Sequence, residues 1–269
     1  MRAIQVSVCG SPEVMKVADL PVPSPGPGQA LVKIAASGVN YIDVYFRSGL
    51  YKAETPMQLG MEAAGTVEAV GSGVDSPKVG DRVAYAMTRG SYAEYAAVAS
   101  SKLVEIPDGV PDEIATALML QGSTAHYLTH SAFPLGKGQT CLVHAGAGGV
   151  GQLLVQLAKA RGARVIATVG TAEKAEIARR LGADVTVLYR TRDFVAAVRE
   201  ATGGAGVDVV YDSVGRETLR RSLTCLKRRG TCINFGASSG QPAPVEVLEL
   251  AEAGSVFLTR PHLADYMAT

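Results

Sequence analysis

The chain has 269 residues, more than a single domain usually contains, so two domains are expected. Hydrophobic residues make up 47% of the sequence, and 26 Lys and Arg nearly balance 25 Asp and Glu. The composition allows a sizeable core, and the charge balance argues against nucleic acid or an anionic membrane as a partner. Four scattered cysteines without CxxC spacing, and no long apolar run, predict a cytoplasmic protein that neither spans nor binds a membrane.

Residues 1–110 are rich in Gly and Pro and contain short alternating apolar runs. Such runs occur at 30–35, 65–70 and 81–85, each bounded by Gly, Pro or Asp. Short strands with this density of turn residues predict a compact, mostly β domain in the form of a partly open barrel. We assign residues 1–124 to this first domain.

A second pattern begins near Pro111, where an apolar-periodic stretch with acids beside the proline predicts a helix. Further on, apolar strands alternate with helical stretches that end at Gly162 and Gly182, because glycine accepts the left-handed backbone that closes a helix. The expected strands are 140–145, 164–169, 184–189, 207–214, 230–235 and 255–260. Six such strands predict an α/β domain with a doubly wound parallel sheet over residues 125–269.

A glycine-rich loop follows the first of these strands and precedes a helix. Gly146, Gly148 and Gly151 match the dinucleotide fingerprint G-x-G-x-x-G, with Gly149 and Val150 inside it. The first glycine makes the tight turn, the second lets the pyrophosphate approach the backbone, and the third lets helix and strand pack closely. The N–H groups at the helix start then receive the phosphates. This position between strand and helix predicts dinucleotide binding.

The end of the second strand indicates which dinucleotide is bound. The sequence there is Val169, Gly170 and Thr171, with Lys174 close behind and no acid at the strand end. An acid would bind the ribose diol of NADH, whereas a cation receives the 2′-phosphate of NADPH. NADPH is therefore expected, and a solvated surface lysine is the competing interpretation of Lys174.

Several further motifs occur in order along the chain. They are 38–45 (GVNYIDVY), 47–51 (RSGLY), 60–65 (GMEAAG), 79–83 (VGDRV), 145–151 (AGAGGVG), 211–215 (YDSVG) and 234–236 (NFG). In these motifs the sequence resembles the medium-chain dehydrogenase/reductase superfamily, and within it the zinc-free NADPH:quinone oxidoreductases and zeta-crystallins. The resemblance implies a GroES-like catalytic domain followed by a Rossmann domain that binds NADPH.

The resemblance also implies that no metal is bound. Zinc alcohol dehydrogenases of the superfamily have a Cys and a His at the positions that are similar to Asn40 and Met61 here. A catalytic zinc needs three suitable protein ligands, and the first domain contains only Cys9 and no histidine. Without a Lewis acid the acceptor must already be electron-poor, as quinones and conjugated enones are, while the nicotinamide carries the chemistry.

Four polar residues look like the substrate side of the family's active site. They are Asn40, Tyr45, Arg47 and Tyr51. Their amide, hydroxyl and guanidinium groups can donate hydrogen bonds to an oxygen that gains negative charge as hydride arrives. The competing interpretation is that the tyrosines pack in the core and that Arg47 forms an ion pair.

Further residues are placed around the cofactor by the same resemblance. They are Tyr41, Asp43, Thr124, Tyr189, Phe235, Gly236, Ala237 and Ser238. Asp43 is expected to orient its loop, and Thr124 could equally serve as a helix cap. Tyr189 resembles the residue beside the 2′-phosphate, with a core position as the equal alternative. His144, at the end of a buried strand, is expected to be a satisfied core histidine.

The expected function is NADPH:quinone oxidoreductase. Two alternatives stay open: an NADPH-dependent reductase of double bonds in alkenals, enones or enoyl thioesters, and a non-catalytic NADPH-binding structural or RNA-binding protein similar to some zeta-crystallins. Relatives continue with a segment that returns to the first domain and that this sequence does not include; either the chain is naturally short or the sequence is truncated, and if the segment is truly absent, uncovered apolar surface is expected on that domain. A homodimer through the sixth Rossmann strand, residues 255–260, is also expected.

Overall fold

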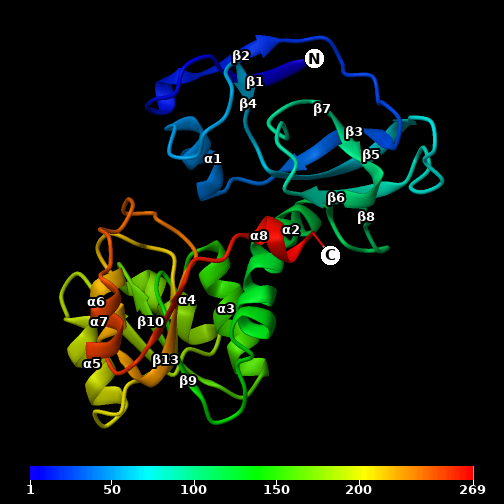
Figure 1. The fold of residues 1–269 in the computed structure, drawn as a ribbon. Helices are drawn as coiled ribbons and strands as arrows, with labels where there is room; N and C mark the ends of the chain where they lie inside the picture. Colours follow the sequence, from blue (N-terminus) through cyan, green and yellow to red (C-terminus); the bar gives the residue numbers. More distant parts are fainter. Residues whose placement is uncertain (269) are drawn as a thin grey trace. The chain divides into compact units, whose positions relative to one another are not determined.

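The computed structural model describes residues 1–268 and divides into two compact units, Met1–Leu120 and Gln121–Thr269 (Figure 1). Thr269, the last residue of the expected second domain, lies outside the described residues. The division falls within helix α2 (Asp112–Tyr127), a few residues before the expected boundary after Thr124.

The first unit consists of two antiparallel sheets. The three-stranded sheet has the order β2-β1-β4, and the five-stranded sheet has the order β7-β3-β5-β6-β8. The strands are β1 (Arg2–Val6), β2 (Met15–Asp19), β3 (Gln29–Ser37), β4 (Met57–Gln58), β5 (Glu62–Val70), β6 (Arg82–Ala86), β7 (Tyr95–Ala99) and β8 (Val104–Glu105). One α-helix, α1 (Tyr41–Arg47), and two 3-10 turns (Pro12–Val14 and Ser100–Lys102) connect them. The alternating runs of the sequence therefore form the β-rich domain that was expected.

The second unit is built on a six-stranded parallel sheet in the order β11-β10-β9-β12-β13-β14. The strands are β9 (Thr140–Val143), β10 (Arg164–Val169), β11 (Val185–Leu188), β12 (Val207–Asp212), β13 (Leu226–Asn234) and β14 (Phe257–Thr259). The helices are α3 (Gly149–Ala160), α4 (Ala172–Arg180), α5 (Phe194–Ala201), α6 (Leu219–Leu223), α7 (Val247–Glu252) and α8 (Leu263–Tyr266), besides a π-helical turn (Leu128–Ala132). Helices lie on both sides of the sheet in Figure 1, and the predicted doubly wound fold is confirmed.

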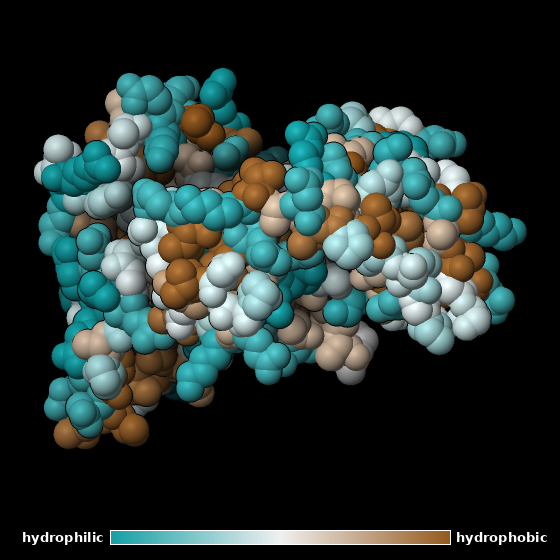
Figure 2. Space-filling view, turned by 90° about the horizontal axis from the view of Figure 1, so that it is seen from above, coloured by the Kyte–Doolittle hydropathy of each residue, from teal (hydrophilic) through white to brown (hydrophobic). Residues whose placement is uncertain are grey.

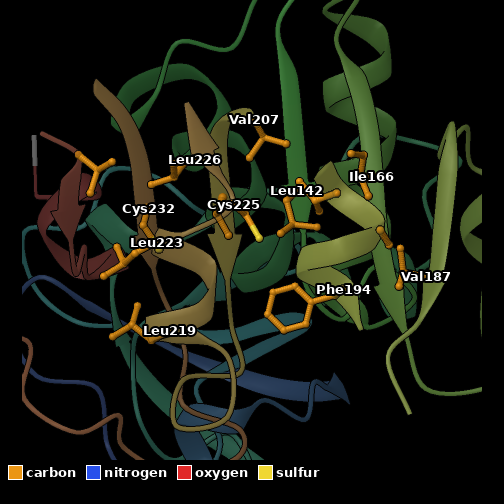
Figure 3. Packing of buried hydrophobic residues seen from close by; sticks show 14 residues of the cluster. Leu142, Ile166, Val187, Phe194, Val207, Leu219, Leu223, Cys225, Leu226 and Cys232 are labelled. Atoms are coloured by element: carbon orange, nitrogen blue, oxygen red, sulfur yellow. The ribbon is translucent and has the colours of Figure 1, made fainter. Parts of the chain in front are cut away.

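The strands of this sheet are apolar because both faces are covered. Leu142, Ile166 and Val210, from the three neighbouring strands β9, β10 and β12, are fully buried. Figure 3 shows Phe194 of α5 beside the strand residues of this core, with Leu219 of α6 in the same cluster. Burial of each such side chain contributes roughly 1.5–3 kcal/mol. The core therefore fixes the strand order on which the edge loops depend.

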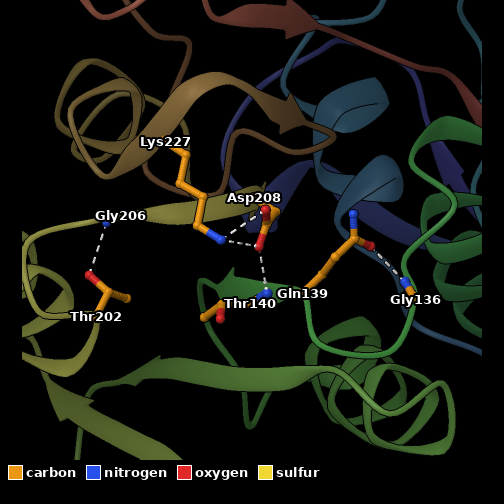
Figure 4. Close-up of polar contacts among 7 residues, drawn as sticks. All are labelled: Gly136, Gln139, Thr140, Thr202, Gly206, Asp208 and Lys227. Atoms are coloured by element: carbon orange, nitrogen blue, oxygen red, sulfur yellow. Dashed lines mark hydrogen bonds and ion pairs between the residues drawn. The ribbon is translucent and has the colours of Figure 1, made fainter.

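A separate group of polar contacts ties together the beginnings of three strands (Figure 4). The Asp208 carboxylate of β12 accepts a hydrogen bond of 2.7 Å from the Thr140 N–H of β9 and an ion-paired contact of 2.8 Å from Lys227 of β13. These contacts lie at the amino ends of parallel strands, opposite the edge where ligands bind in such sheets. They stabilise the sheet rather than form part of a ligand site.

The surface mixes polar and apolar residues. Figure 2 shows hydrophilic residues over much of the visible face, with hydrophobic residues in scattered groups between them. Among residues 1–268, no helix combines the length and the apolar character needed to cross a bilayer.

Candidate active site

The glycine loop lies between β9 and α3, at the carboxyl edge of the central strand. Gly148 is the N-cap of α3 and has extended backbone, with φ −80° and ψ 172°. The Gly148 N–H donates to the Ala145 carbonyl at 2.8 Å, and the Gly146 N–H donates to the Thr168 carbonyl of β10 at 3.0 Å. These bonds close the tight turn and aim the first N–H groups of α3 at the edge of the sheet, where an anion is favoured.

The space around each glycine separates packing positions from an approach position. A Cβ at Gly151 would lie 2.1 Å from the Ala145 carbonyl oxygen, and one at Gly146 would lie 2.7 Å from the Ala167 Cβ. A Cβ at Gly148 would meet only the Ala145 oxygen at 3.2 Å and the Ala145 Cβ at 3.9 Å. Gly146 and Gly151 are therefore needed for packing, while Gly148 keeps the loop surface open for a phosphate. This cradle suits the pyrophosphate of a dinucleotide.

Gln121 is a further residue at the loop that sequence reasoning missed. A Cβ at Gly149 would lie 2.1 Å from the Gln121 Oε1, so this side chain covers the first residue of α3. Its position follows from the course of α2, which local sequence pattern does not reveal.

The expected 2′-phosphate site gathers residues from the ends of β10 and β11. Thr171 caps α4 by accepting the Lys174 N–H at 3.3 Å. A Cβ at Gly170 would lie 3.3 Å from the Tyr189 hydroxyl and 3.6 Å from the Arg190 Nε, so both side chains lie beside this glycine. Tyr189 is 47% exposed, which excludes the core alternative for this tyrosine. Arg190 was missed, although a basic residue directly after a strand of such a sheet was the available signal.

The charge at this edge is mainly positive. Within residues 1–268, neither Lys174 nor Arg190 has an ion-pair partner, although both side chains are exposed. One carboxylate, Glu173, lies in the same turn. Hydrogen bonds from its own backbone N–H and from the Thr171 hydroxyl hold the pKa of Glu173 below its usual value. Lys174 and Arg190 are thus two exposed cations at the ends of β10 and β11, and Glu173 is already engaged with its own helix start.

The loop after β13 packs against the loop after β12. The Phe235 N–H donates to the Asp212 carbonyl at 2.9 Å, and the Ser238 N–H donates to the Ser213 carbonyl at 3.1 Å. A Cβ at Gly236 would lie 2.5 Å from the Ser213 carbonyl oxygen, so glycine is required there, and Ala237 is buried beside it. Strand order reverses between β9 and β12, the place where doubly wound sheets bind ligands. The structure therefore brings residues 235–238 to the edge that the glycine loop occupies.

In the first unit, the start of α1 is held by a buried carboxylate. Asn40 is the N-cap of this helix. Asp43 Oδ2 accepts the Asn40 N–H at 3.0 Å and the Tyr92 hydroxyl at 2.9 Å, while its Oδ1 accepts the Gly60 N–H at 3.1 Å. Asp43 thus orients its loop, as expected, and Tyr92 is a partner that sequence reasoning missed. Burial raises the pKa of Asp43 above its ordinary value.

Glu62 is the second buried carboxylate of this unit and was also missed. Its Oε1 accepts the Asn40 Nδ2–H at 2.7 Å, and its Oε2 accepts the Leu120 N–H at 2.7 Å. The side chain is fully buried, and a Cβ at Gly38 would lie 2.0 Å from the Glu62 Oε1. Burial raises the pKa of Glu62, and the nearby Asp43 raises it further. The acid in the motif at 60–65 was the signal that could have identified it.

The tyrosines and the arginine of α1 and the following turn lie in two environments. Tyr45 is buried, and its ring centroid lies 5.2 Å from that of Tyr51 and 6.2 Å from that of Tyr41, which is exposed. The Arg47 Nε donates to the Gly10 carbonyl at 3.3 Å. Among the described residues Arg47 forms no ion pair, so the competing expectation for its guanidinium is wrong. The substrate-side role of Tyr45, Arg47 and Tyr51, like that of Asn40, stays a prediction, and so does the place of Tyr41 at the cofactor.

Thr124 and His144 are the remaining residues of the second unit for which the sequence made a prediction. Thr124 is buried within α2, and its place at the cofactor stays a prediction. His144 is buried, with Nδ1 3.0 Å from the Thr168 Oγ1 and Nε2 2.9 Å from the Ser222 Oγ. It is the satisfied core histidine that was expected. In the part of the chain that the structure describes, no three His, Cys, Asp or Glu side chains gather to form a metal site.

Family models match both parts of the chain. Residues 26–108 match the alcohol dehydrogenase GroES-like domain, and residues 149–262 match the model described as zinc-binding dehydrogenase. A quinone oxidoreductase of Pseudomonas aeruginosa is 46% identical over 100% of this chain and 83% of its own length. A 2-haloacrylate reductase of Burkholderia sp. is 45% identical over 96% of this chain and 80% of its own length. The crystal structure of Escherichia coli quinone oxidoreductase complexed with NADPH superposes with a TM-score of 0.98, at 43% identity, over 100% of this chain and 83% of that one.

Proposed function

The chain belongs to the quinone oxidoreductase family of the medium-chain dehydrogenases/reductases, and on that premise we propose that it transfers reducing equivalents from NADPH to a quinone without a metal. The observation that carries this proposal is the cofactor edge of the second unit. There an open glycine loop and two exposed cations, Lys174 and Arg190, which have no ion-pair partner among residues 1–268, suit a dinucleotide with a 2′-phosphate. We assign NADPH binding to the second unit and acceptor binding to the first.

Each part of the cofactor edge has a distinct task in this proposal. The N–H groups at the start of α3 bind the pyrophosphate, with Gly148 leaving the space for it. Lys174, Arg190 and the Tyr189 hydroxyl bind the 2′-phosphate, because cations form stronger hydrogen bonds to phosphate than neutral groups do. When bound, NADPH supplies the hydride.

On the acceptor side, Asn40 is the central candidate. Asp43 fixes its backbone N–H and Glu62 accepts from its amide, so two buried carboxylates hold this residue in one orientation. A group that is oriented in advance stabilises charge on a substrate oxygen without reorganising during the reaction. Tyr45, Arg47 and Tyr51 are the other proposed contacts of the acceptor, on or directly after α1.

The test is NADPH oxidation by the purified protein, followed optically with a simple quinone, a matched alkenal and 2-chloroacrylate in parallel. Turnover that is faster with the quinone, and faster with NADPH than with NADH, is the expected result. Gly148→Ala is expected to raise KM for NADPH by at least roughly tenfold, whereas Gly136→Ala, whose Cβ would meet its nearest atom at 3.7 Å, is the matched control. Equal rates with NADPH and NADH would refute the proposed role of Lys174 and Arg190.

A second candidate is reduction of an activated carbon–carbon double bond. It is favoured by the 45% identity to a protein named 2-haloacrylate reductase, nearly the same as the identity to the quinone oxidoreductases. The same fold and cofactor site serve both reactions, so only the acceptor contacts distinguish them. Preference for the alkenal or the haloacrylate would select this candidate. NADPH binding without turnover of any acceptor would instead favour the non-catalytic role.

We also propose a homodimer through β14 and a cytoplasmic location. The strand β14 is at the end of the sheet order, and Phe257 on it is 61% exposed, which favours pairing with a second copy. Four free cysteines suit a reducing compartment. A monomeric mass by light scattering would refute the dimer, and Phe257→Lys is expected to produce that mass.

A further inference from the structure

A chain of hydrogen bonds runs through the interior of the second unit beneath the cofactor edge. Thr168 at the end of β10, His144 after β9, Ser222 of α6 and Asp212 at the end of β12 are all buried, the last two completely. The links are Ala145 N to Thr168 Oγ1 at 3.4 Å, Thr168 Oγ1 to His144 Nδ1 at 3.0 Å, His144 Nε2 to Ser222 Oγ at 2.9 Å, and Ser222 Oγ to Asp212 Oδ2 at 3.0 Å. The chain thus joins two strand ends through one imidazole.

The direction of every bond in this chain follows from the Asp212 carboxylate at one end and from the neutral state of the His144 imidazole. The Asp212 carboxylate accepts only, so the Ser222 hydroxyl donates to it and must accept from the His144 Nε2–H. The imidazole is neutral because complete burial lowers the pKa of His144. Its Nδ1 therefore accepts from the Thr168 hydroxyl, whose oxygen in turn accepts the Ala145 N–H. One tautomer of His144 satisfies all of these groups.

Both ends of the chain lie at loops of the cofactor edge. Ala145 has φ +53°, in the left-handed region that a residue with a Cβ rarely adopts, and it directly precedes the glycine loop. At the other end, Asp212 Oδ1 accepts the N–H groups of Val214 and Gly215, both at 2.9 Å, in the loop after β12. The chain therefore connects the two loops that follow β9 and β12, between which the strand order reverses.

We propose that His144 is a positioning residue for cofactor binding, which it serves by holding the strained turn at Ala145 and the loop at 213–215 in register through Thr168, Ser222 and Asp212. The inference rests on the proposed NADPH binding. His144 contacts no ligand in this proposal. It is nevertheless expected to affect the affinity for NADPH specifically, and not the steps of turnover that follow NADPH binding. A merely structural histidine would affect stability and all kinetic constants alike.

The experiment compares Thr168→Val, which keeps the shape but removes the hydroxyl, with Thr168→Ser, which restores the hydroxyl. Fluorescence titration of NADPH without an acceptor is expected to give a Kd raised roughly tenfold in Thr168→Val, and returned to within about threefold in Thr168→Ser, as loss and recovery of one buried hydrogen-bond partner predict. KM for NADPH is expected to rise with Kd while kcat stays within about twofold. Thr129→Val removes another buried hydroxyl of the same unit, bonded to the Ala125 carbonyl at 2.9 Å, and is the matched control with unchanged Kd.

Ser222→Ala breaks the chain at its other end and provides the second arm. Its Kd for NADPH is expected to rise similarly, and the double variant with Thr168→Val is expected to bind little worse than either single variant, because one break already disconnects the chain. ¹⁵N spectra of labelled histidine are expected to show His144 protonated at Nε2 in the wild type and changed in Ser222→Ala. An unchanged Kd in Thr168→Val, an equal rise in Thr129→Val, or additive effects in the double variant would each overturn the inference. Because the titration needs no acceptor, failure of quinone turnover would count against the proposed function alone.

Discussion

Replacing single glycines of the loop by alanine separates packing from cofactor binding. In Gly151→Ala the new Cβ would lie 2.1 Å from the Ala145 carbonyl oxygen and 2.9 Å from the Gly146 Cα. An ordinary van der Waals contact of a Cβ begins at 3.4 Å, so α3 or the turn must move by 3.4 − 2.1 = 1.3 Å. The atoms in the way belong to the backbone and cannot move aside as the end of a flexible side chain could. Overpacking of this kind costs about 1–3 kcal/mol or more.

Gly148→Ala is the informative comparison. Its Cβ would lie 3.2 Å from the Ala145 oxygen, so a shift of 3.4 − 3.2 = 0.2 Å relieves it, and its extended backbone suits alanine. We expect this variant to fold normally but to lose affinity for NADPH by at least roughly tenfold, about 1.4 kcal/mol, because the methyl group occupies the approach of the pyrophosphate.

The assay combines thermal unfolding with NADPH titration. At roughly 2–4 °C per kcal/mol for a domain of this size, a cost of about 1–3 kcal/mol is expected to lower the Tm of Gly151→Ala by about 2–12 °C, and the Tm of Gly148→Ala should fall by less than about 2 °C. Gly136→Ala, in a loop of the same unit with its nearest atom at 3.7 Å, is expected to change neither quantity. If Gly148→Ala bound NADPH like the wild type, or if Gly151→Ala melted at the wild-type temperature, the steric reasoning would be wrong.

Three further predictions concern charge and protonation. Lys174→Gln is expected to reduce the ratio of NADPH to NADH affinity by roughly tenfold, since a charged hydrogen bond to phosphate is lost, and paired titrations measure that ratio; equal loss for both cofactors would contradict the assignment. Glu62→Gln keeps the size of the side chain but gives the Asn40 amide a weaker acceptor, so kcat/KM for the quinone is expected to fall by about tenfold at unchanged Kd for NADPH, as steady-state kinetics would show. Burial lowers the pKa of His144 in the folded state, so below the ordinary histidine pKa of about 6.5 only the unfolded state takes up the proton. The free energy of unfolding therefore decreases as the pH is lowered, by up to about 1.4 kcal/mol per pH unit. Urea unfolding between pH 7.5 and pH 5.5 should show a steeper loss in the wild type than in His144→Gln, and parallel curves would refute the sign.

The borders of the elements show how far local pattern reaches. The predicted strand 164–169 matches β10, and the predicted strand 255–260 shrinks to β14 (Phe257–Thr259). The predicted start at residue 230 was wrong for β13, which begins at Leu226. In the structure Arg229 has φ +60°, and the pairing with β12 shifts register, so the strand continues through an irregularity that periodicity does not reveal.

The sequence by itself determined the two-part organisation, the alternation of strands and helices and the glycine loop, and it predicted NADPH from Lys174, whose role stays a prediction. These features depend on neighbours along the chain: a helix cap, a turn glycine or an apolar period requires only a few consecutive residues. The family resemblance also predicted Asn40 as a site residue, but it did not predict which side chains contact Asn40.

Only the tertiary structure decided which groups meet around those residues. Glu62 reaches both Asn40 and Leu120, which lie 22 and 58 positions away, and His144 bonds to Ser222, 78 positions away. A buried carboxylate or imidazole is tolerated only where hydrogen-bond partners replace water, and those partners are set by the packing of distant elements rather than by local sequence. For the same reason Gln121 became a candidate only when the course of α2 placed it beside Gly149, and the ends of β10 and β11 placed Arg190 beside Gly170.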